Sequence, residues 1–278
     1  MSELFADVNG KKICYEAFGD GFPLILIHGA GAKKETWIAQ IKDFSEKNKL
    51  IILDIRGTGK SDRPNYLYTM EMFADDIKGL MDDLKIEKAN IVGRSMGGMI
   101  AQHFALMYPD YMEKLILITT SPGFPDEEGV ELMIQNNIKE LEKAKLDPIN
   151  SYWQKSRLLY HQKFRKEMEA NPNKKFFDIW SPMDLIKEDS IDPPHAQDIR
   201  NQWYAIKKHN TFDKLSQIKH TTLLIAASHD RLTPRTIMEK MHELIPNSTL
   251  KIIQKAGHYC HLSNVHEFNQ IILEFLEN

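Results

Sequence analysis

The sequence predicts an α/β fold, with a mostly parallel central sheet and helices on both of its faces. Short apolar runs of strand length alternate with longer stretches in which apolar residues recur at helical spacing. Runs of consecutive apolar residues suit strands that are buried on both faces, as strands of a parallel sheet are. The alternation stops after residue 121 and resumes near residue 211. We therefore expect one long insertion in an otherwise regular α/β core.

The local pattern places each element of this core. Apolar runs predict strands at residues 12–17, 23–27, 50–53, 89–92, 115–118, 222–226 and 249–253. Helical spacing predicts helices at residues 36–47, 69–84, 96–108, 235–244 and 265–276. The helix at 96–108 is expected to stop before Pro109, because proline lacks the backbone N–H that would continue it.

The insertion is predicted to be a helical cap, or lid, that follows the sixth strand. It covers residues 122–210, so residues 1–121 and 211–278 make up the core domain. The segment is charged, rich in aromatic residues and divided by prolines into short helices. An insertion at the carboxyl end of a strand lies where open α/β sheets bind ligands. The candidate substrate contacts are Trp153, Trp180 and Trp203 in the cap and Tyr259 in the core.

Composition narrows the class of protein. The chain has 278 residues, of which 42% are hydrophobic and 27% charged, and its net charge is −3. This balance gives no electrostatic reason to expect nucleic acid or an anionic membrane as a partner. No apolar run approaches the roughly 20 residues that cross a bilayer, and the first residues do not resemble a secretory signal. Cys14 and Cys260 form no pattern, so a cytoplasmic location is the simplest expectation, with the oligomeric state left open.

Ser95 is the strongest candidate for a functional residue. It occupies the centre of a G-x-S-x-G motif, in which Gly93 and Gly97 flank it at two residues' distance. An apolar strand precedes the motif and a helical pattern follows it. At such a sharp strand-to-helix turn the serine hydroxyl is exposed, and glycines leave the space that side chains would otherwise fill. Ser95 is therefore predicted to be a nucleophile.

Two further residues complete a predicted catalytic triad. Asp230 follows the strand at 222–226, and His258 follows the strand at 249–253. Carboxyl ends of parallel strands meet at one edge of the sheet, and the chain order Ser, Asp, His is typical of enzymes with this serine turn. His258 would then be the base that activates Ser95, and Asp230 would orient the imidazole ring.

The developing oxyanion also needs hydrogen-bond donors. The backbone N–H groups of Ala30, after the strand at 23–27, and of Met96, at the start of the helix after Ser95, are the candidates. His28 is interpreted as a residue that holds this loop by hydrogen bonds rather than as a second base. No metal or other cofactor is expected, because His258 is needed as the base and Cys260 with His261 does not make a metal site.

Taken together, these motifs resemble the α/β-hydrolase superfamily over nearly the whole chain. The motifs that carry the resemblance are His28-Gly29-Ala30-Gly31, Asp54-Ile55-Arg56-Gly57-Thr58-Gly59-Lys60-Ser61-Asp62, Gly93-Arg94-Ser95-Met96-Gly97-Gly98, Ser228-His229-Asp230 and Ala256-Gly257-His258. The resemblance implies the α/β-hydrolase fold. It also implies that Asp54, Arg56 and Ser61 anchor a loop.

The resemblance further implies acyl chemistry on a small molecule. A serine at the turn argues against haloalkane dehalogenases and epoxide hydrolases of this fold, which use an aspartate there. The main expectation is a carboxylesterase that cleaves small to medium esters through an acyl-enzyme. The alternatives are a lactonase, a perhydrolase-like enzyme or a carbon–carbon bond hydrolase of ring-fission products. This last group usually carries tryptophan where Tyr259 stands. A ligand sensor without turnover is the remote alternative.

Arg94 departs from the His, Tyr or Asn that usually precedes the nucleophile in this family. We interpret it as a buried residue with a structural hydrogen-bonding role rather than as a residue that attracts an anionic substrate. Positive and negative side chains nearly cancel in the cap, which favours a neutral or apolar substrate.

Overall fold

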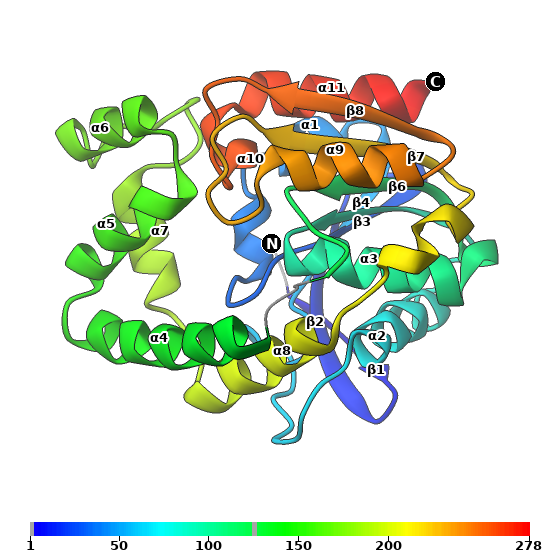
Figure 1. The fold of residues 1–278 in the computed structure, drawn as a ribbon, viewed down its shortest axis with the longest axis horizontal. Helices are drawn as coiled ribbons and strands as arrows, with labels where there is room; N and C mark the ends of the chain where they lie inside the picture. Colours follow the sequence, from blue (N-terminus) through cyan, green and yellow to red (C-terminus); the bar gives the residue numbers. More distant parts are fainter. Residues whose placement is uncertain (1–2, 124–126) are drawn as a thin grey trace.

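The computed structural model describes residues 3–123 and 127–278, with the side chains of residues 127 and 128 left out. In this part of the chain, eight strands form one sheet in the order β1-β2-β4-β3-β5-β6-β7-β8 (Figure 1). The strands are β1 (Leu4–Val8), β2 (Lys11–Phe18), β3 (Phe22–Ile27), β4 (Asn48–Leu53), β5 (Ala89–Arg94), β6 (Met112–Ile118), β7 (Thr221–Ala227) and β8 (Ser248–Ile253). β2 pairs antiparallel with β1 and β4, and all pairs from β4 to β8 are parallel.

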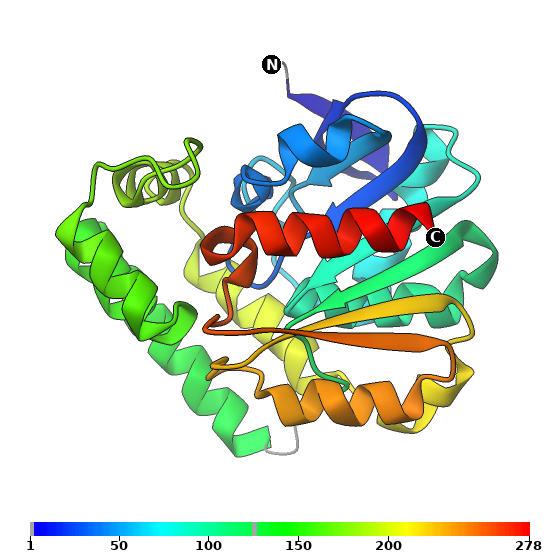
Figure 2. The ribbon, with the colours of Figure 1, turned by 90° about the horizontal axis from the view of Figure 1, so that it is seen from above.

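Helices cover both faces of the sheet (Figure 2). One face packs against α2 (Met70–Asp83), α3 (Met96–Met107) and α9 (Arg235–Leu244), and the other packs against α1 (Ile41–Ser45) and α11 (Val265–Glu277). The short helices η1 (Lys34–Trp37), η2 (Pro109–Tyr111), η3 (Phe212–Gln217) and α10 (Cys260–Ser263) lie in the connections. The central strands β3, β5, β6 and β7 are almost wholly buried, as their continuous apolar runs predicted.

The predicted α/β fold is therefore confirmed, with two differences in detail. The first strand, β1, was not predicted, because it lies at the sheet edge and only alternate residues of it are buried. The single helix predicted at residues 36–47 is divided into η1 and α1. Gln40 lies between them, fully buried, and its side-chain amide donates to the backbone carbonyl of His261 and to Asn269 Oδ1.

The insertion between β6 and β7 consists of helices. They are α4 (Glu127–Leu146), α5 (Pro148–Leu159), α6 (Gln162–Ala170), α7 (Pro182–Asp189) and α8 (Ala196–Lys208), and we call them the cap. The chain leaves and re-enters the core at one point, where Thr211 N–H donates to Pro122 O (2.7 Å). This point agrees with the predicted limits of 122 and 210, although the division into two domains stays a prediction. In Figures 1 and 2 the cap lies beside the edge of the sheet where the parallel strands end.

Packing holds the cap to the core. Leu159, Tyr160, Met168, Phe176 and Trp180 of the cap form one buried cluster, together with Ala39, Leu262 and Val265 of the core. Aromatic side chains dominate the cap part of this cluster, and such side chains bury the largest apolar area per residue. Most of the cap aromatic residues therefore stabilise the cap itself. No helix in the described part of the chain is long and apolar enough to span a membrane.

The loop after β4 is anchored as the resemblance implied. Arg56 donates to both carboxylate oxygens of Asp76 on α2, and both side chains are buried. Asp54 accepts from the backbone N–H groups of Lys34 and Lys60. Ser61 Oγ donates to Asp54 O at 2.6 Å. The loop is thus fixed to α2 and to η1, and the hydrogen bonds of Asp54 with Lys60 and Ser61 close it on itself.

Glycines allow α3 to approach the sheet. A Cβ atom at Gly97, in the first turn of α3, would lie 2.2 Å from Ile27 O at the end of β3. A Cβ at Gly93, at the end of β5, would lie 2.2 Å from Gly97 O. Both contacts are with backbone atoms, so the start of α3 can lie this close to β3 and β5 only without side chains at these positions. The position of residue 95 between them depends on this approach.

We expect Gly97→Ala to destabilise the protein by about 1–3 kcal/mol, because the added methyl group overpacks the contact between α3 and β3. Within a helix, Gly→Ala normally stabilises by about 1 kcal/mol. Urea unfolding of the variant and the wild type shows directly whether the substitution lowers or raises the free energy of unfolding. A gain in stability would show that the approach of α3 to β3 is not constrained.

We expect Asp76→Ala to lower the free energy of unfolding by about 3–5 kcal/mol, because it leaves the buried Arg56 guanidinium without its carboxylate. Asp82→Ala on the same helix is the matched control. Asp82 is half exposed and pairs with Lys78, so its loss should change stability by less than about 1 kcal/mol. Equal effects of the two substitutions in urea unfolding would contradict the prediction.

Candidate functional site

Ser95 stands at a strained turn between β5 and α3. Its backbone has φ 55° and ψ −121°, which non-glycine residues rarely adopt. Two hydrogen bonds support this turn: Ser95 N–H donates to Ile118 O, at the end of the neighbouring strand β6 (2.9 Å), and Thr120 Oγ1, just after β6, donates to Ser95 O (2.7 Å). The side chain is only half-buried. The turn thus has the conformation that the G-x-S-x-G motif predicted.

The loop after β3 lies against this turn. A Cβ atom at Gly29 would be 3.0 Å from Ser95 Cβ and 3.3 Å from Arg94 O, so the loop and the turn are in direct contact. Ala30 follows Gly29 in this loop. In the described part of the chain, no hydrogen bond uses the backbone N–H of Ala30 or of Met96 as a donor. Both groups are therefore available, and their assignment as oxyanion donors stays a prediction.

Asp230 and His258 lie together at the ends of β7 and β8. His258 Nδ1 and Asp230 Oδ2 are 2.8 Å apart, and only 3% and 8% of the two residues' surfaces are exposed. The Asp230 carboxylate also accepts from Leu232 N–H, Thr233 N–H and Thr233 Oγ1. The Asp230 carboxylate thus accepts hydrogen bonds from the backbone of the following turn and also pairs with the imidazole of His258.

The charge state of Asp230 determines which nitrogen of His258 carries a proton. Burial acts to raise the pKa of Asp230, but hydrogen bonds from His258 and Thr233 lower its pKa below the usual value. The carboxylate is therefore ionised at neutral pH and can only accept hydrogen bonds. It follows that His258 Nδ1 donates, and that neutral His258 presents Nε2 as an acceptor.

Ser95 and His258 both contact the end of β6. Thr119 Oγ1 donates to His258 O (3.4 Å), and the next residue, Thr120, donates to Ser95 O. The serine turn and the histidine loop therefore flank two consecutive residues. No hydrogen bond in the described part of the chain joins Ser95 Oγ to His258. Such catalytic contacts are often long before substrate binds, so the triad as a whole stays a prediction.

The helix α5 of the cap docks on the histidine loop. Tyr259 N–H donates to Leu159 O, the last residue of α5, at 2.9 Å. A Cβ atom at Gly257 would lie 2.6 Å from the same carbonyl oxygen. Glycine before His258 thus lets the backbone of the cap approach the loop, and the cap contributes to the position of His258.

His28 holds the loop after β3, as interpreted from the sequence. Its Nδ1 lies 2.8 Å from Gly29 O, and its Nε2 lies 3.3 Å from both Ile55 N and Thr58 Oγ1. Burial lowers the pKa of His28 to about 4. The imidazole is therefore neutral and links the loops after β3 and β4.

Arg94 differs from its expected role. Its side chain is buried, with 1% of the residue exposed, and its guanidinium lies over the Tyr259 ring at 4.4 Å from the centroid. Among the described residues it makes no hydrogen bond or ion pair, and Nε is buried without a partner. The interpretation as a structural hydrogen-bonding residue is therefore wrong. The contact that the guanidinium does make is the cation–π contact with Tyr259.

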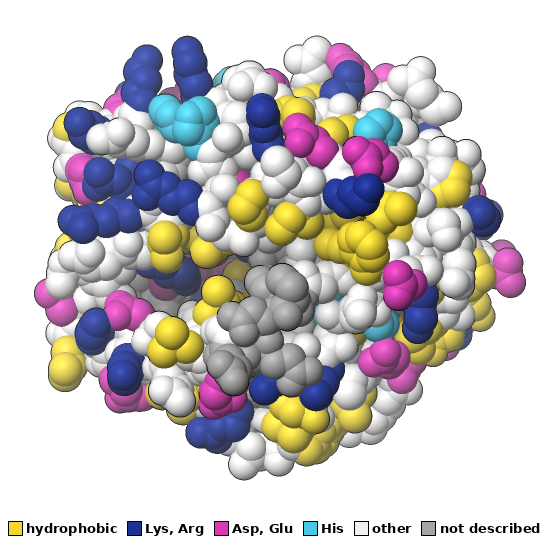
Figure 3. Space-filling model, viewed as in Figure 1, with side chains coloured by type: hydrophobic (Ala, Val, Ile, Leu, Met, Phe, Trp, Pro, Cys, Tyr) yellow, Lys and Arg dark blue, Asp and Glu magenta, His cyan; other side chains and the backbone are white. Residues whose placement is uncertain are grey.

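A cavity of about 440 Å³ lies between the cap and the core loop that carries Ala30. Figure 3 shows the corresponding hollow in the surface beside the cap. A smaller cavity next to it is lined by Tyr259 and Leu262 of the core and by Leu159 and Tyr160 of the cap. Lys155, Tyr152 and Asp189 line both. The size falls within the range of small-molecule sites.

The candidate aromatic contacts divide between these cavities and the cap interior. Trp203 lines the larger cavity and Tyr259 the smaller one. Trp180 is buried in the cap cluster, and Trp153 packs against that cluster. Neither lines the two cavities described here, and their role as substrate contacts stays a prediction. Sequence reasoning missed Lys155 and Asp189, because neither belongs to a motif.

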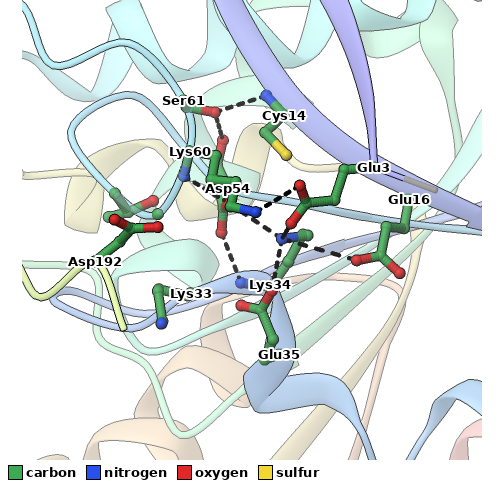
Figure 4. A network of polar contacts seen from close by, with 12 residues as sticks. Glu3, Cys14, Glu16, Lys33, Lys34, Glu35, Asp54, Lys60, Ser61 and Asp192 are labelled. Carbon is green, nitrogen blue, oxygen red and sulfur yellow. Dashed lines mark hydrogen bonds and ion pairs between the residues drawn. The ribbon is translucent and has the colours of Figure 1, made fainter. Parts of the chain in front are cut away.

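One described group has the arrangement of metal ligands. Oxygens of Glu3, Glu16 and Glu35 lie within 4.8 Å of one another. The ammonium of Lys34 lies among them, 2.5 Å from Glu35, 3.5 Å from Glu3 and 3.8 Å from Glu16 (Figure 4). Burial alone would lower the pKa of Lys34, but Asp54 and Glu35 raise its pKa above the usual value. A charged lysine thus already pairs with each of these carboxylates.

The chain is similar to known hydrolases over its whole length. A hydrolase of 2-hydroxy-6-oxononadienedioate and 2-hydroxy-6-oxononatrienedioate from Comamonas testosteroni is 28% identical and covers 100% of both chains. A meta-cleavage product hydrolase from Pseudomonas fluorescens IP01 is 25% identical with a TM-score of 0.80, covering 99% of this chain and 97% of the other. The enol-lactonase from Burkholderia xenovorans LB400 shares the fold, with 21% identity and a TM-score of 0.83 over 99% and 100% of the two chains.

The family model of the alpha/beta hydrolase fold matches residues 23–265. This range includes the serine turn, the Asp230–His258 pair and the whole cap. Together with the sheet order and the helices on both faces, the match shows that the chain belongs to the α/β-hydrolase family.

Proposed function

We propose that this protein is a serine hydrolase that cleaves small to medium carboxylic esters, including lactones, through an acyl-enzyme. The Asp230–His258 hydrogen bond beside the serine turn is the observation that carries the proposal. An ionised carboxylate fixes the imidazole so that its free nitrogen can act as a base. Ser95, half-buried at a strained turn against the same strand end, is the hydroxyl that this base would activate.

The proposed reaction uses these groups in two steps. His258 takes the proton of Ser95 as Oγ attacks the substrate carbonyl, and the resulting imidazolium is stabilised by Asp230. The backbone N–H groups of Ala30 and Met96 receive the oxyanion, a contribution of about 3–4 kcal/mol for one donor. The alcohol leaves with the proton from His258. Water, activated by the same histidine, then releases the acid and restores Ser95.

We expect Ser95→Ala to lower kcat for p-nitrophenyl butyrate by at least about three orders of magnitude, because the acyl-enzyme cannot form. Asp230→Asn should lower kcat by about 10⁴, because the amide favours the wrong tautomer of His258. The rate of p-nitrophenolate release at saturating substrate measures kcat for both variants.

Ser121→Ala is the matched control for these variants. Ser121 also follows β6 at this edge of the sheet, and its Oγ is buried without a hydrogen-bond partner. Its activity should stay near that of the wild type. Full activity of Ser95→Ala would rule out the proposed nucleophile, and full activity of Asp230→Asn would rule out the orienting role.

Carbon–carbon bond hydrolysis of a ring-fission product is the second candidate. It is favoured by the relative from Comamonas testosteroni, which is similar over 100% of both chains and is named for this kind of substrate. Tyr259 argues in the other direction, since the family resemblance leads us to expect tryptophan after the histidine in such enzymes. The same triad would serve both reactions.

A substrate panel separates the two candidates. We expect the wild type to hydrolyse p-nitrophenyl butyrate and a simple lactone with a larger kcat/KM than a coloured 2-hydroxy-6-oxo-dienoate, whose loss is followed by its visible absorbance. The reverse order would establish the second candidate and reject the first. Binding without turnover of any of the three would instead favour a ligand sensor.

A further inference from the structure

Three lysines line the cavity under the cap, and they differ in how their charges are balanced. Lys33 binds Glu188 through an ion pair (2.9 Å) and also donates to the carbonyls of Glu188 and Ile191. Lys145 pairs with Glu142 at 2.8 Å. Lys155 makes neither a hydrogen bond nor an ion pair with any residue that the structure describes. Its ammonium is thus free to bind a ligand.

The helix α5 places Lys155 on the walls of both cavities, one turn before its contact with the loop of His258. Lys155 and Leu159 are four residues apart and therefore share one face of α5. The carbonyl of Leu159 accepts from Tyr259 N–H, so this face ends on the loop of His258. Lys155 lies one turn earlier and lines both the larger cavity, which reaches Ala30, and the smaller one, which reaches Tyr259. Lys155 as a whole is exposed to solvent, so a ligand can reach it.

The electrostatic surroundings keep Lys155 charged. Tyr259 and Asp189 raise the pKa of its ammonium above the usual value, although burial acts against them. Asp189 is the acidic residue that shares both cavity walls with it, and burial raises the pKa of Asp189. No ion pair joins the two residues, so Asp189 does not occupy the ammonium of Lys155.

Arg94 adds a second positive charge on the same side. It is buried below the Tyr259 ring, and no described carboxylate pairs with it. A buried charge without a partner is costly, and an anion in the adjacent cavity would offset part of that cost. Lys155 from the cap and Arg94 from the core thus approach Tyr259 from two different elements.

We propose that the cavity under the cap binds a substrate whose acyl part ends in a carboxylate, and that Lys155 is the residue that pairs with this carboxylate. The inference rests on the proposed serine-hydrolase function and specifies its substrate class. Lys155 is a specificity-determining residue in this proposal, and it takes no part in the chemical step. A count of charges in the cap sequence does not identify Lys155, because positive and negative side chains nearly cancel there. The structure distinguishes it, because the neighbouring lysines are paired and Lys155 is not.

The test compares two esters that differ by one terminal carboxylate group, mono-p-nitrophenyl glutarate and p-nitrophenyl butyrate. We expect Lys155→Met to lower kcat/KM for the glutarate ester by about tenfold or more, the usual effect of losing a hydrogen bond to a charged group. Activity on the butyrate ester should change by less than about twofold, within the usual range for a residue outside the chemical step. Lys155→Arg should keep most of the preference, because it keeps the charge.

Two further variants exclude a merely structural role. Lys166→Met removes an exposed lysine of α6 that lines neither cavity, and it should leave both activities unchanged. Asp189→Asn removes the competing carboxylate and should raise kcat/KM for the glutarate ester. If Lys155 only stabilised the cap through Asp189, both Lys155→Met and Asp189→Asn would affect the two esters equally, which would overturn the proposal.

Binding to an inactive variant separates this inference from the proposed function. Calorimetry with Ser95→Ala should show tighter binding of mono-p-nitrophenyl glutarate than of p-nitrophenyl butyrate, and Ser95→Ala/Lys155→Met should lose that difference. Hydrolysis of both esters without any effect of Lys155→Met would refute the carboxylate site and leave the serine hydrolase intact. Absence of Ser95-dependent hydrolysis would refute the proposed function, whatever the binding result.

Discussion

The approach of backbone to backbone around residue 95 is the constraint on which the rest of the site depends. Three glycines, from the loop after β3, the end of β5 and the start of α3, leave no room for a side chain where these segments meet. Ser95 consequently adopts a conformation with positive φ that places it at the end of the sheet. Ile118 at the end of β6 and Thr120 just after it hold this turn by hydrogen bonds to its N–H and to its carbonyl.

The remaining site residues are placed by the parallel sheet. Neighbouring strands β6, β7 and β8 end at one edge, and the loops that follow them carry the threonines, the aspartate and the histidine of the site. Each residue is secured by more than one contact: the Asp230 carboxylate, for example, accepts four hydrogen bonds from three residues. Redundancy of this kind fixes the orientation of the imidazole before any substrate arrives.

Much of this arrangement could be predicted from the sequence, because it depends on local patterns. Apolar runs located the buried strands, and the ends of those strands located Ser95, Asp230 and His258. The edge strand β1 was missed because only its alternate residues are buried. Arg94 stands out in the sequence only as a departure from the family pattern, and no pattern in the sequence shows that Lys155 and Arg94 lack an ion-pair partner. That property depends on how the cap packs on the core, which no short motif encodes.

The contact between α5 and the loop of His258 links two parts of the molecule that are distant in sequence. One backbone hydrogen bond joins the carbonyl at the end of α5 to the amide directly after the histidine. If the cap swung away as a rigid lid, this bond would break and the imidazole would lose one of its supports. If the ligand enters by this movement of the cap, His258 is consequently not fully aligned while the ligand is being admitted. An entrance that spares α5 would keep the site assembled throughout the cycle.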